Sequence, residues 1–536
     1  MNSPTHDTLT GSEKSPRPSG LPPSTQAAYD DPEARPRGLA YVFGGPGVTV
    51  GPRIAPVSAD MVTSDAASDD SADAILTKQR EAEDGCAIQY RTCSWQKTAG
   101  LLFSEYICLA IMSFPWAYSV LGLVPGLILT VFIAGTVLYT SLVLWQFCLR
   151  HPEVRDICDI GQMLFWGQRW AWYATAVMFI LNNTFIQGLH VLIGAEYLNT
   201  MTEANTITCS TVVFSVIMML ISWLCSLPRT FDMLSKLAFA SAFFTFISVI
   251  LATIFSAIED HPADFNPQSI FTDARGASHV GGNPIVTAIP VKGTTFVAGM
   301  NAFLSISYTF IGQITLPSFI AEMRDPRDFP KALWACTIAE IIVFGIVGSV
   351  IYAYTGNQYM TAPAFGSLED RYKKISFSFM IPTLIFLGVL YASVSSRFVF
   401  FRVFKNNRRH INNHTLVGWG TWALILFTTW IAAFIISQVI PIFTSLLSLM
   451  SSLFDSFFGF IFWGLAYFRM RSADKRVGRK SVNKIVEYLS VAANLFIIFI
   501  GCFFLSVGTY ASVEGIIDEF RAGTTRGVFS CASNGL

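Results

Sequence analysis

Long apolar stretches dominate this chain and restrict its fold more than any other feature. About eleven of them, each long enough to cross a lipid bilayer, lie between Thr98 and Tyr510. A hydrocarbon core about 30 Å thick requires about 20 apolar residues in a helix, and a soluble core cannot use so many continuous apolar runs. Hydrophobic residues make up 52% of the sequence and charged residues only 13%. The sequence therefore predicts an all-α polytopic membrane protein.

The predicted membrane spans are bounded by polar segments that contain most of the charged residues. We predict helices over 98–121, 124–148, 170–198, 209–227, 234–257, 296–320, 332–354, 377–404, 417–436, 440–468 and 488–510. Residues 1–90 are rich in Pro, Ser, Asp and Gly, a composition that buries too little apolar surface to fold, so we expect a disordered cytosolic tail. Residues 91–512 then form the transmembrane domain, and residues 513–536 form a short extracellular tail.

The distribution of Lys and Arg predicts the orientation, because cytosolic loops of membrane proteins are enriched in basic residues. A cytosolic amino terminus places the basic clusters within 402–409 and 469–484 on the inner side, whereas the outer segment 199–207 contains no basic residue. The formal net charge is zero, which gives no indication of nucleic-acid binding. The cysteines show no metal-ligand spacing and are interpreted as buried thiols; a link between Cys209 and Cys531, both on the predicted outer side, is an alternative.

Two of the predicted spans contain residues that interrupt helices. The first span contains Pro115, whose missing N–H frees carbonyls near Ile111, and the sixth contains Gly312 and Pro317. Breaks in the first and sixth spans are typical of transporters built from two five-helix repeats of inverted topology, in which the broken helices meet at the substrate site. The alternative is that each proline is an ordinary kink, which membrane helices tolerate.

Several short segments, in this order around these spans, resemble the amino acid/auxin permease family, and most closely its fungal neutral amino acid permeases of the methyltryptophan-resistance type. The resemblance extends from about Gln89 to Phe468 and is carried by the segments 89–92, 114–115 with 122–126, 227–230, 322–329, and 440–441 followed by 451–454. It implies eleven helices in the leucine-transporter architecture, ten of them forming the inverted repeats, and amino acid symport driven by a proton gradient. The chain departs from the family's often glycine-rich first break, where it has Cys108, Ala110 and Ser113.

A zwitterionic substrate needs donors for its carboxylate and acceptors for its ammonium group, and unwound backbone supplies both. The candidate substrate-binding residues from the two breaks are Ala110, Ile111, Met112, Ser113, Tyr308, Thr309, Phe310 and Gly312, with Asn183 added from the third span. Their apolar and aromatic side chains favour a neutral substrate. The alternative for each side chain is packing between helices.

Ionisable residues inside spans are functional candidates because burying them is unfavourable. Glu105, Lys236 and Asp455 are the candidates for proton coupling. Ten residues of ideal helix separate Glu105 from Pro115, about 15 Å, so we expect Glu105 near the cytosolic gate, as a coupling group or in a salt bridge. Ser393 and Ser396, with carbonyls near Ile107 and Ala110, are an alternative sodium site.

These observations favour a proton-coupled importer of neutral amino acids in the plasma membrane, whose partners are the amino acid, the proton and the lipid bilayer. The alternatives are a vacuolar transporter, a sodium-coupled transporter, and a sensor that binds an amino acid without net transport. No nucleotide-binding loop, zinc-protease motif or nucleophile–base arrangement is recognisable in the sequence, so we expect neither an enzyme nor a cofactor.

Overall fold

The computed structural model describes residues 40–45, 48, 50–54, 93–154, 156–202, 209–229, 231–404, 410, 414–478, 484–523 and 525–536, with the backbone alone at 40, 41 and 231–238. Almost all regular structure in these residues is helical. The two short strands β1 (Ile270–Thr272) and β2 (Ser278–Val280) form one antiparallel hairpin in which Ile270 pairs with Val280.

Eight helical segments in the described residues are long and apolar enough to cross a membrane. They are α5 (Leu123–Arg150), α7 (Arg169–Thr202), α9 (Phe231–Ile258), α12 (Phe329–Thr355), α14 (Ile381–Val403), α16 (Leu416–Val439), the run of α17 (Phe443–Met450), the π-helix η4 (Ser451–Ile461) and α18 (Phe462–Arg476), and the run of α19 (Lys484–Phe503), η5 (Phe504–Gly508) and α20 (Thr509–Ala522).

The remaining predicted spans correspond to shorter or broken helices. The first consists of α3 (Trp95–Tyr106), the 3₁₀ helix η1 (Leu109–Ser113) and α4 (Phe114–Leu121), with a bend of 48° at the break. The fourth is α8 (Ser210–Ser226), and the sixth consists of α10 (Phe296–Phe310) and α11 (Leu316–Glu322). The predicted all-α polytopic architecture is therefore confirmed.

Several elements differ from the sequence-based expectations. The chain forms α6 (Ile157–Leu164) before the third span and α13 (Asp370–Ser378) before the eighth, so the eighth helix begins at Ile381 rather than at residue 377. The last helix continues to Ala522, beyond the predicted end at residue 510. Helix α1 (Ala40–Phe43) packs on α12, so this part of the predicted disordered tail is ordered against the bundle. Short 3₁₀ turns complete the set: η2 (Pro326–Asp328) and η3 (Ala364–Ser367).

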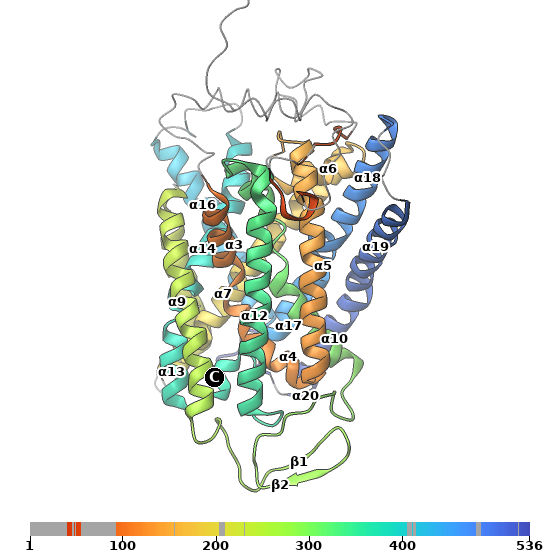
Figure 1. Cartoon of the computed structure of the whole chain (residues 1–536). Helices are drawn as coiled ribbons and strands as arrows, with labels where there is room; N and C mark the ends of the chain where they lie inside the picture. Colours follow the sequence, from red (N-terminus) through yellow and green to blue (C-terminus); the bar gives the residue numbers. More distant parts are fainter. Residues whose placement is uncertain are drawn as a thin grey trace, which may run out of the picture.

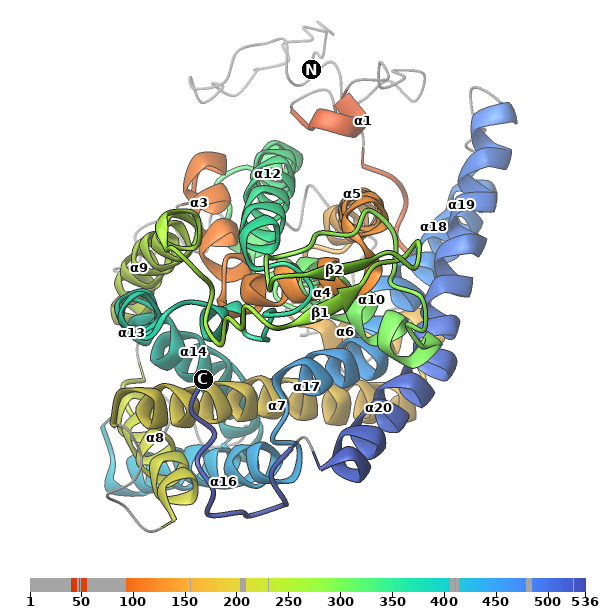
Figure 2. The ribbon, with the colours of Figure 1, turned by 90° about the horizontal axis from the view of Figure 1, so that it is seen from below.

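The long helices lie side by side and form a bundle with two distinct ends (Figure 1). We call the end that bears α6 the basic end, because α5 ends there at Arg150 and α7 begins there at Arg169. We call the opposite end, which bears β1 and β2, the hairpin end. Seen from the hairpin end, α4, α10 and α17 lie in the interior, with α8, α9 and α19 around them (Figure 2).

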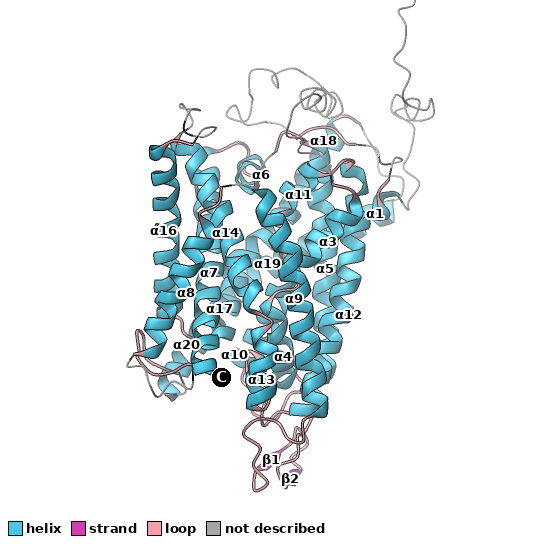
Figure 3. Ribbon diagram, turned by 90° about the vertical axis from the view of Figure 1, so that its left-hand side faces the viewer, coloured by secondary structure: helices cyan, strands magenta, loops and turns pink. Residues whose placement is uncertain are grey.

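The two broken spans run in opposite directions through the bundle. Helices α3 and α11 lie toward the basic end, and α4 and α10 lie toward the hairpin end, where they pack on each other (Figure 3). A small aromatic cluster holds the two spans together: the ring of Phe114 lies 6.1 Å from that of Phe310 and 5.0 Å from that of Phe344. An antiparallel arrangement of this kind is what an inverted repeat requires.

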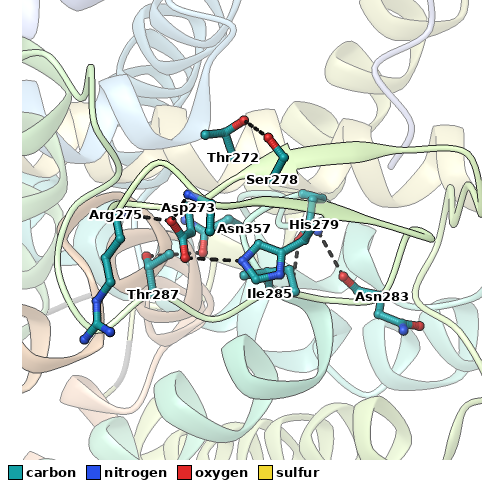
Figure 4. Close-up of polar contacts among 11 residues, drawn as sticks. Thr272, Asp273, Arg275, Ser278, His279, Asn283, Ile285, Thr287 and Asn357 are labelled. Atoms are coloured by element: carbon teal, nitrogen blue, oxygen red, sulfur yellow. Dashed lines mark hydrogen bonds and ion pairs between the residues drawn. The ribbon is translucent and has the colours of Figure 1, made fainter.

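The segment between α9 and α10 covers the hairpin end and is fastened by polar contacts. In the hairpin the carboxylate of Asp273 accepts hydrogen bonds from the backbone of Arg275 and Ala277 and from the ring of His279 (Figure 4). These donors lower the pKa of Asp273. Further along, Leu123 N–H donates to the carbonyl of Thr287 at 3.0 Å, which caps the first turn of α5 with the loop.

Candidate functional site

The first span breaks earlier in the chain than Pro115 suggests. Helix α3 ends at Tyr106, and Cys108 is fully extended, with φ −121° and ψ −176°. Pro115 lies in the first turn of α4, where its missing N–H leaves no hydrogen bond unmade. The expectation that unwound backbone lies at 110–113 is therefore wrong, because Ala110, Ile111, Met112 and Ser113 continue as the 3₁₀ helix η1.

The sixth span breaks where Gly312 and Pro317 indicate. Helix α10 ends at Phe310, and α11 begins at Leu316 with Pro317 in its first turn. A Cβ atom on Gly312 would approach the ring of Tyr106 to 2.6 Å, so only glycine lets the two breaks come this close. Helix ends leave backbone N–H and C=O groups without intrahelical partners, and here four such ends meet.

A cavity of about 540 Å³, including the part open to solvent, lies between the two breaks. Its walls come from both broken spans and from α7, α14 and η4; the lining residues are Glu105, Tyr106, Cys108, Asn182, Ile186, Tyr308, Thr309, Ile311, Gly312, Ile314, Tyr391, Asp455 and Phe458. In the described part of the chain, no Lys or Arg lines the cavity.

The structure brings some of the sequence-predicted site residues to this cavity and places others in the surrounding core. Glu105, Tyr308, Thr309, Gly312 and Asp455 line it. The side chains of the other predicted residues do not line it and are almost completely buried: Ala110, Ile111, Met112, Ser113, Asn183 and Phe310. Asn183 donates to Ser395 Oγ at 2.7 Å, which links α7 to α14, whereas the neighbouring Asn182 reaches the cavity.

Glu105 lies at the first break rather than at the cytosolic gate. The expected separation from Pro115 assumed a continuous helix, but α3 ends one residue after Glu105. Its carboxylate accepts a hydrogen bond from Tyr391 Oη at 3.0 Å and another from Thr315 Oγ1 at 3.1 Å. It therefore connects the first span to both α14 and the sixth-span break. In the described part of the chain Glu105 forms no ion pair, although the side chain of Lys236 lies outside the description.

Asp455 also lines the cavity, from η4, a π-helical stretch within the tenth span. Its Oδ2 atom is buried without a hydrogen-bond partner, and the residue is only 5% exposed. Insertions of π-helix in α-helices occur frequently at functional sites because they displace side chains from the regular α-helical faces. The two carboxylates of the cavity thus differ: both oxygens of Glu105 accept hydroxyl donors, and one oxygen of Asp455 accepts none.

The remaining candidates are placed as follows. Lys236 is on α9, and its side chain lies outside the described residues. Ser393 and Ser396 are buried on α14, and neither hydroxyl oxygen has a hydrogen-bond partner among the described residues.

Sequence reasoning did not identify two residues that contact Glu105. Tyr391 sits in an apolar stretch of α14, and Thr315 lies between the two helix breakers of the sixth span. Proximity to Gly312 and Pro317 was an available signal for Thr315, because residues between helix breakers lie in non-helical backbone. For Tyr391 no local signal exists, since its contact with Glu105 joins residues 286 positions apart.

Comparisons with known proteins identify relatives along most of the chain. Residues 91–513 match the family model described as transmembrane amino acid transporter protein. A Neurospora crassa protein described as an N amino acid transport system protein is 31% identical over 462 residues, covering 85% of this chain and 92% of that protein. Two further relatives are described as transmembrane transporters. The one from Gibberella moniliformis is 28% identical, over 90% of this chain and 95% of that protein. The one from Fusarium pseudograminearum is 29% identical, over 85% of this chain and 91% of that protein.

Proposed function

Because the chain belongs to the transmembrane amino acid transporter family, as its resemblance to the amino acid/auxin permeases indicated, we propose that it is a proton-coupled symporter of neutral amino acids. The transport cycle would expose the cavity between the two breaks alternately to each side of the membrane. The observation that carries this proposal is the position of Glu105 in the wall of that cavity, bound to both the sixth span and α14.

The backbone at the breaks supports recognition of a zwitterion. The carbonyl ends of α3 and α10 and the N-cap of η1, Cys108, border the same cavity, and the break before α11 borders it at Gly312 and Ile314. Helix C-termini carry partial negative charge and N-termini partial positive charge. An amino acid bound here would direct its ammonium group toward the carbonyl ends and its carboxylate toward the N–H ends.

The side chains that line the cavity support a neutral substrate. Tyr308, Ile311 and Phe458 offer aromatic and aliphatic surface to a substrate side chain. In the described part of the chain no basic residue is available there to neutralise an acidic substrate side chain. Binding an acidic amino acid would bury an uncompensated negative charge, which is strongly unfavourable.

Glu105 is the proposed proton carrier. When ionised, its carboxylate can accept hydrogen bonds from both Thr315 and Tyr391. Thr315 Oγ1 has a second acceptor, the carbonyl of Gly312 at 2.8 Å, and its single hydroxyl proton can serve only one acceptor at a time. Protonating Glu105 weakens it as an acceptor and releases Thr315 to the carbonyl. The link between the first and sixth spans thus depends on the proton.

The orientation and the compartment are part of the proposal. Basic residues terminate helices at the basic end, which suits the cytosolic side. A disulfide joins Cys209 to Cys531 at the hairpin end, and disulfides persist in oxidising compartments, which suits the extracellular side. We therefore propose a plasma-membrane location with the amino terminus in the cytosol; the vacuolar membrane is the alternative.

Uptake of labelled neutral amino acids into proteoliposomes would test the proposal. We would compare an inward proton gradient, an inward sodium gradient and no gradient, with Glu105→Gln and, as a control, the exposed Asp518→Asn. We expect wild type and the control to accumulate substrate only with the proton gradient. Glu105→Gln should lose accumulation but retain exchange of internal for external substrate, because it mimics the protonated carboxyl.

Other results would contradict the proposal. Accumulation driven only by sodium would favour the alternative site at Ser393 and Ser396, whose unpartnered hydroxyls are the observation in its favour. Binding without accumulation under any gradient would favour a sensor.

A further inference from the structure

Asp455 lines the same cavity as Glu105, and its Oδ2 atom accepts no hydrogen bond from the described residues, but it has no part in the proton-coupling mechanism described above. We propose that Asp455 binds the α-ammonium group of the transported amino acid, so that the site selects substrates with a free, charged amino group. This inference rests on the proposed transport of amino acids, and it assigns different roles to the two carboxylates of one cavity.

The packing of η4 directs this part of the tenth span at the sixth-span break. Gly459 follows Asp455 by four residues, and a Cβ atom there would lie 2.9 Å from the side chain of Ile311. Phe454, the residue directly before Asp455, packs its ring edge-on against the ring of Phe185 on α7, with 5.6 Å between the centroids. Asp455 is therefore held between α7 and the break, on rigid helical backbone beside the cavity.

The polar partners of the two carboxylates differ in a way that points to a ligand. Each oxygen of Glu105 already accepts a hydroxyl hydrogen bond. Asp455 forms no ion pair in the described part of the chain, and its Oδ2 atom accepts no hydrogen bond there. The hydroxyl of Ser451, one turn earlier on the same helical run, can donate to Asp455 but brings no opposite charge. A buried carboxylate without a counter-charge is strongly unfavourable, so a cation supplied from the cavity would stabilise it.

An ammonium group fits this position because its N–H donors match the acceptors that border it. In the described residues no group of three or more His, Cys, Asp or Glu side chains could hold a metal. The carbonyl end of α10, which borders the cavity at Tyr308 and Thr309, supplies further acceptors for the N–H donors of an ammonium group. A primary ammonium has three donors, which one carboxylate oxygen and neighbouring carbonyls can accept.

Binding to purified full-length protein would test this inference. The probes are a labelled neutral amino acid and, as unlabelled competitors, the same amino acid, its α-hydroxy acid analogue and its N-acetyl derivative. The variants are Asp455→Asn, which removes the charge at nearly constant shape, and Asp455→Glu, which keeps it. Asp518→Asn on the exposed face of α20 serves as the matched control.

We expect wild type and Asp518→Asn to prefer the amino acid over its α-hydroxy analogue by about 100-fold, the scale of a lost buried charge pair. Asp455→Asn should weaken amino acid binding by about the same factor while the α-hydroxy analogue competes within about twofold of its wild-type affinity. Asp455→Glu should restore part of the preference for the amino acid.

Three results would overturn the inference. Equal weakening of both ligands in Asp455→Asn would mean that the residue only maintains the shape of the site. Unchanged selectivity combined with altered proton or sodium dependence of uptake would make Asp455 a coupling group instead. The test is separable from the proposed function, because binding selectivity is measured without a gradient. If proton symport fails, the inference about Asp455 still stands. If the wild-type protein binds no amino acid, both this inference and the proposed function are contradicted.

Discussion

Two segments near the ends of the chain are fastened to opposite ends of the bundle by different chemistry. At the basic end, described residues within 50–54 contact the end of α5 and the residues after it through titratable groups, and residues 42 and 43 contact Trp334 of α12. Ile54 N–H donates to the ring of His151 at 3.0 Å, and Arg53 pairs with Glu153, which also contacts His151. These contacts depend on His151 remaining a neutral acceptor and Glu153 remaining ionised.

At the hairpin end, residues 525–536 are fastened by a covalent bond and by hydrogen bonds, one of which comes from the side chain of Lys373. Cys531 is joined to Cys209 at the start of α8, and Thr211 Oγ1 donates to the carbonyl of Ala532 at 2.6 Å. Beyond them Leu536 N–H donates to Thr200 of α7, and Lys373 of α13 donates to the carbonyl of Leu536 at 2.9 Å. The segment thus connects α7, α8 and α13, near the C mark in Figure 2.

This difference suggests that each end responds to the chemistry of its own compartment. Proton symport acidifies the compartment it delivers to, and the proposed cytosolic end carries the acid-sensitive attachment. The proposed outer end carries a covalent attachment, which a reductant would break. Four predictions would break or sharpen this contrast.

The largest effect should come from removing the disulfide. Cys209→Ala with Cys531→Ala should lower the stability of the folded bundle by about 2–4 kcal/mol, because the open chain regains conformational freedom when it unfolds. Thermal unfolding in detergent measures this, and a membrane-impermeant reductant should reproduce it in the wild type. Cys502→Ala, at an exposed free cysteine, is the control. A variant as stable as the wild type would show that the disulfide does not fasten this end.

Glu153→Gln should release the segment at the basic end with a smaller effect. Removing the charge leaves Arg53 and His151 without their ionic partner, and we expect a local loss of about 1–3 kcal/mol. Hydrogen exchange at Ile54 should accelerate by the corresponding factor while exchange at Ala532 and Leu536 stays unchanged. Equal acceleration at both ends would mean that the bundle loosens as a whole.

Acid should weaken the same attachment. Burial lowers the pKa of His151 below its ordinary value of 6.5, although Glu153 partly offsets this. The pKa of Glu153 is also lowered: burial alone would raise it, but the contacts with His151 and Arg53 outweigh burial. For both groups the unfolded state binds more protons, so stability is lost as the pH falls, for His151 from about 6.5 downward.

The size of the acid effect is at most about 1.4 kcal/mol per pH unit for each group. Limited proteolysis of residues 40–54 between pH 7.5 and 5.5 would detect it. In His151→Gln the new side chain can still accept a hydrogen bond from Ile54 N–H but does not titrate. This variant should therefore flatten the pH profile of proteolysis between pH 7.5 and 6, which lies above the range in which Glu153 titrates. Persistence of the full pH dependence in that variant would assign it to another group.

The smallest effect should come from Trp334→Phe. Trp334 Nε1–H donates to the carbonyl of Val42 at 2.9 Å, and its ring packs 5.6 Å from that of Phe43. Phenylalanine keeps the ring contact and loses the hydrogen bond, so we expect about 0.5–1.5 kcal/mol, confined to α1. Hydrogen exchange in residues 40–45 measures it. A larger effect than that of Glu153→Gln would reverse the proposed ranking of the two contacts.

The sequence predicted the spans well because membrane insertion depends on local composition. Each apolar run had to form a helix, since lipid offers no partner for backbone N–H and C=O groups. The interruptions at Pro115 and at Gly312 with Pro317 identified the two broken spans, and the resemblance to the amino acid/auxin permeases is confirmed by the family match. Tyr308, Thr309 and Gly312 lie at the cavity for the same local reason, because they flank a helix breaker.

Only the tertiary structure decided where the first span breaks and which residues meet there. The proline was accommodated in the first turn of α4, so the unwound backbone moved to Ile107 and Cys108 and brought Glu105 to the cavity. The contact of Glu105 with Tyr391 joins residues hundreds of positions apart, and so does the disulfide between Cys209 and Cys531, which the sequence offered only as an alternative to buried thiols. A hydrophobic pattern describes each helix alone, whereas these pairs depend on how helices pack against each other, which no single segment of the sequence encodes.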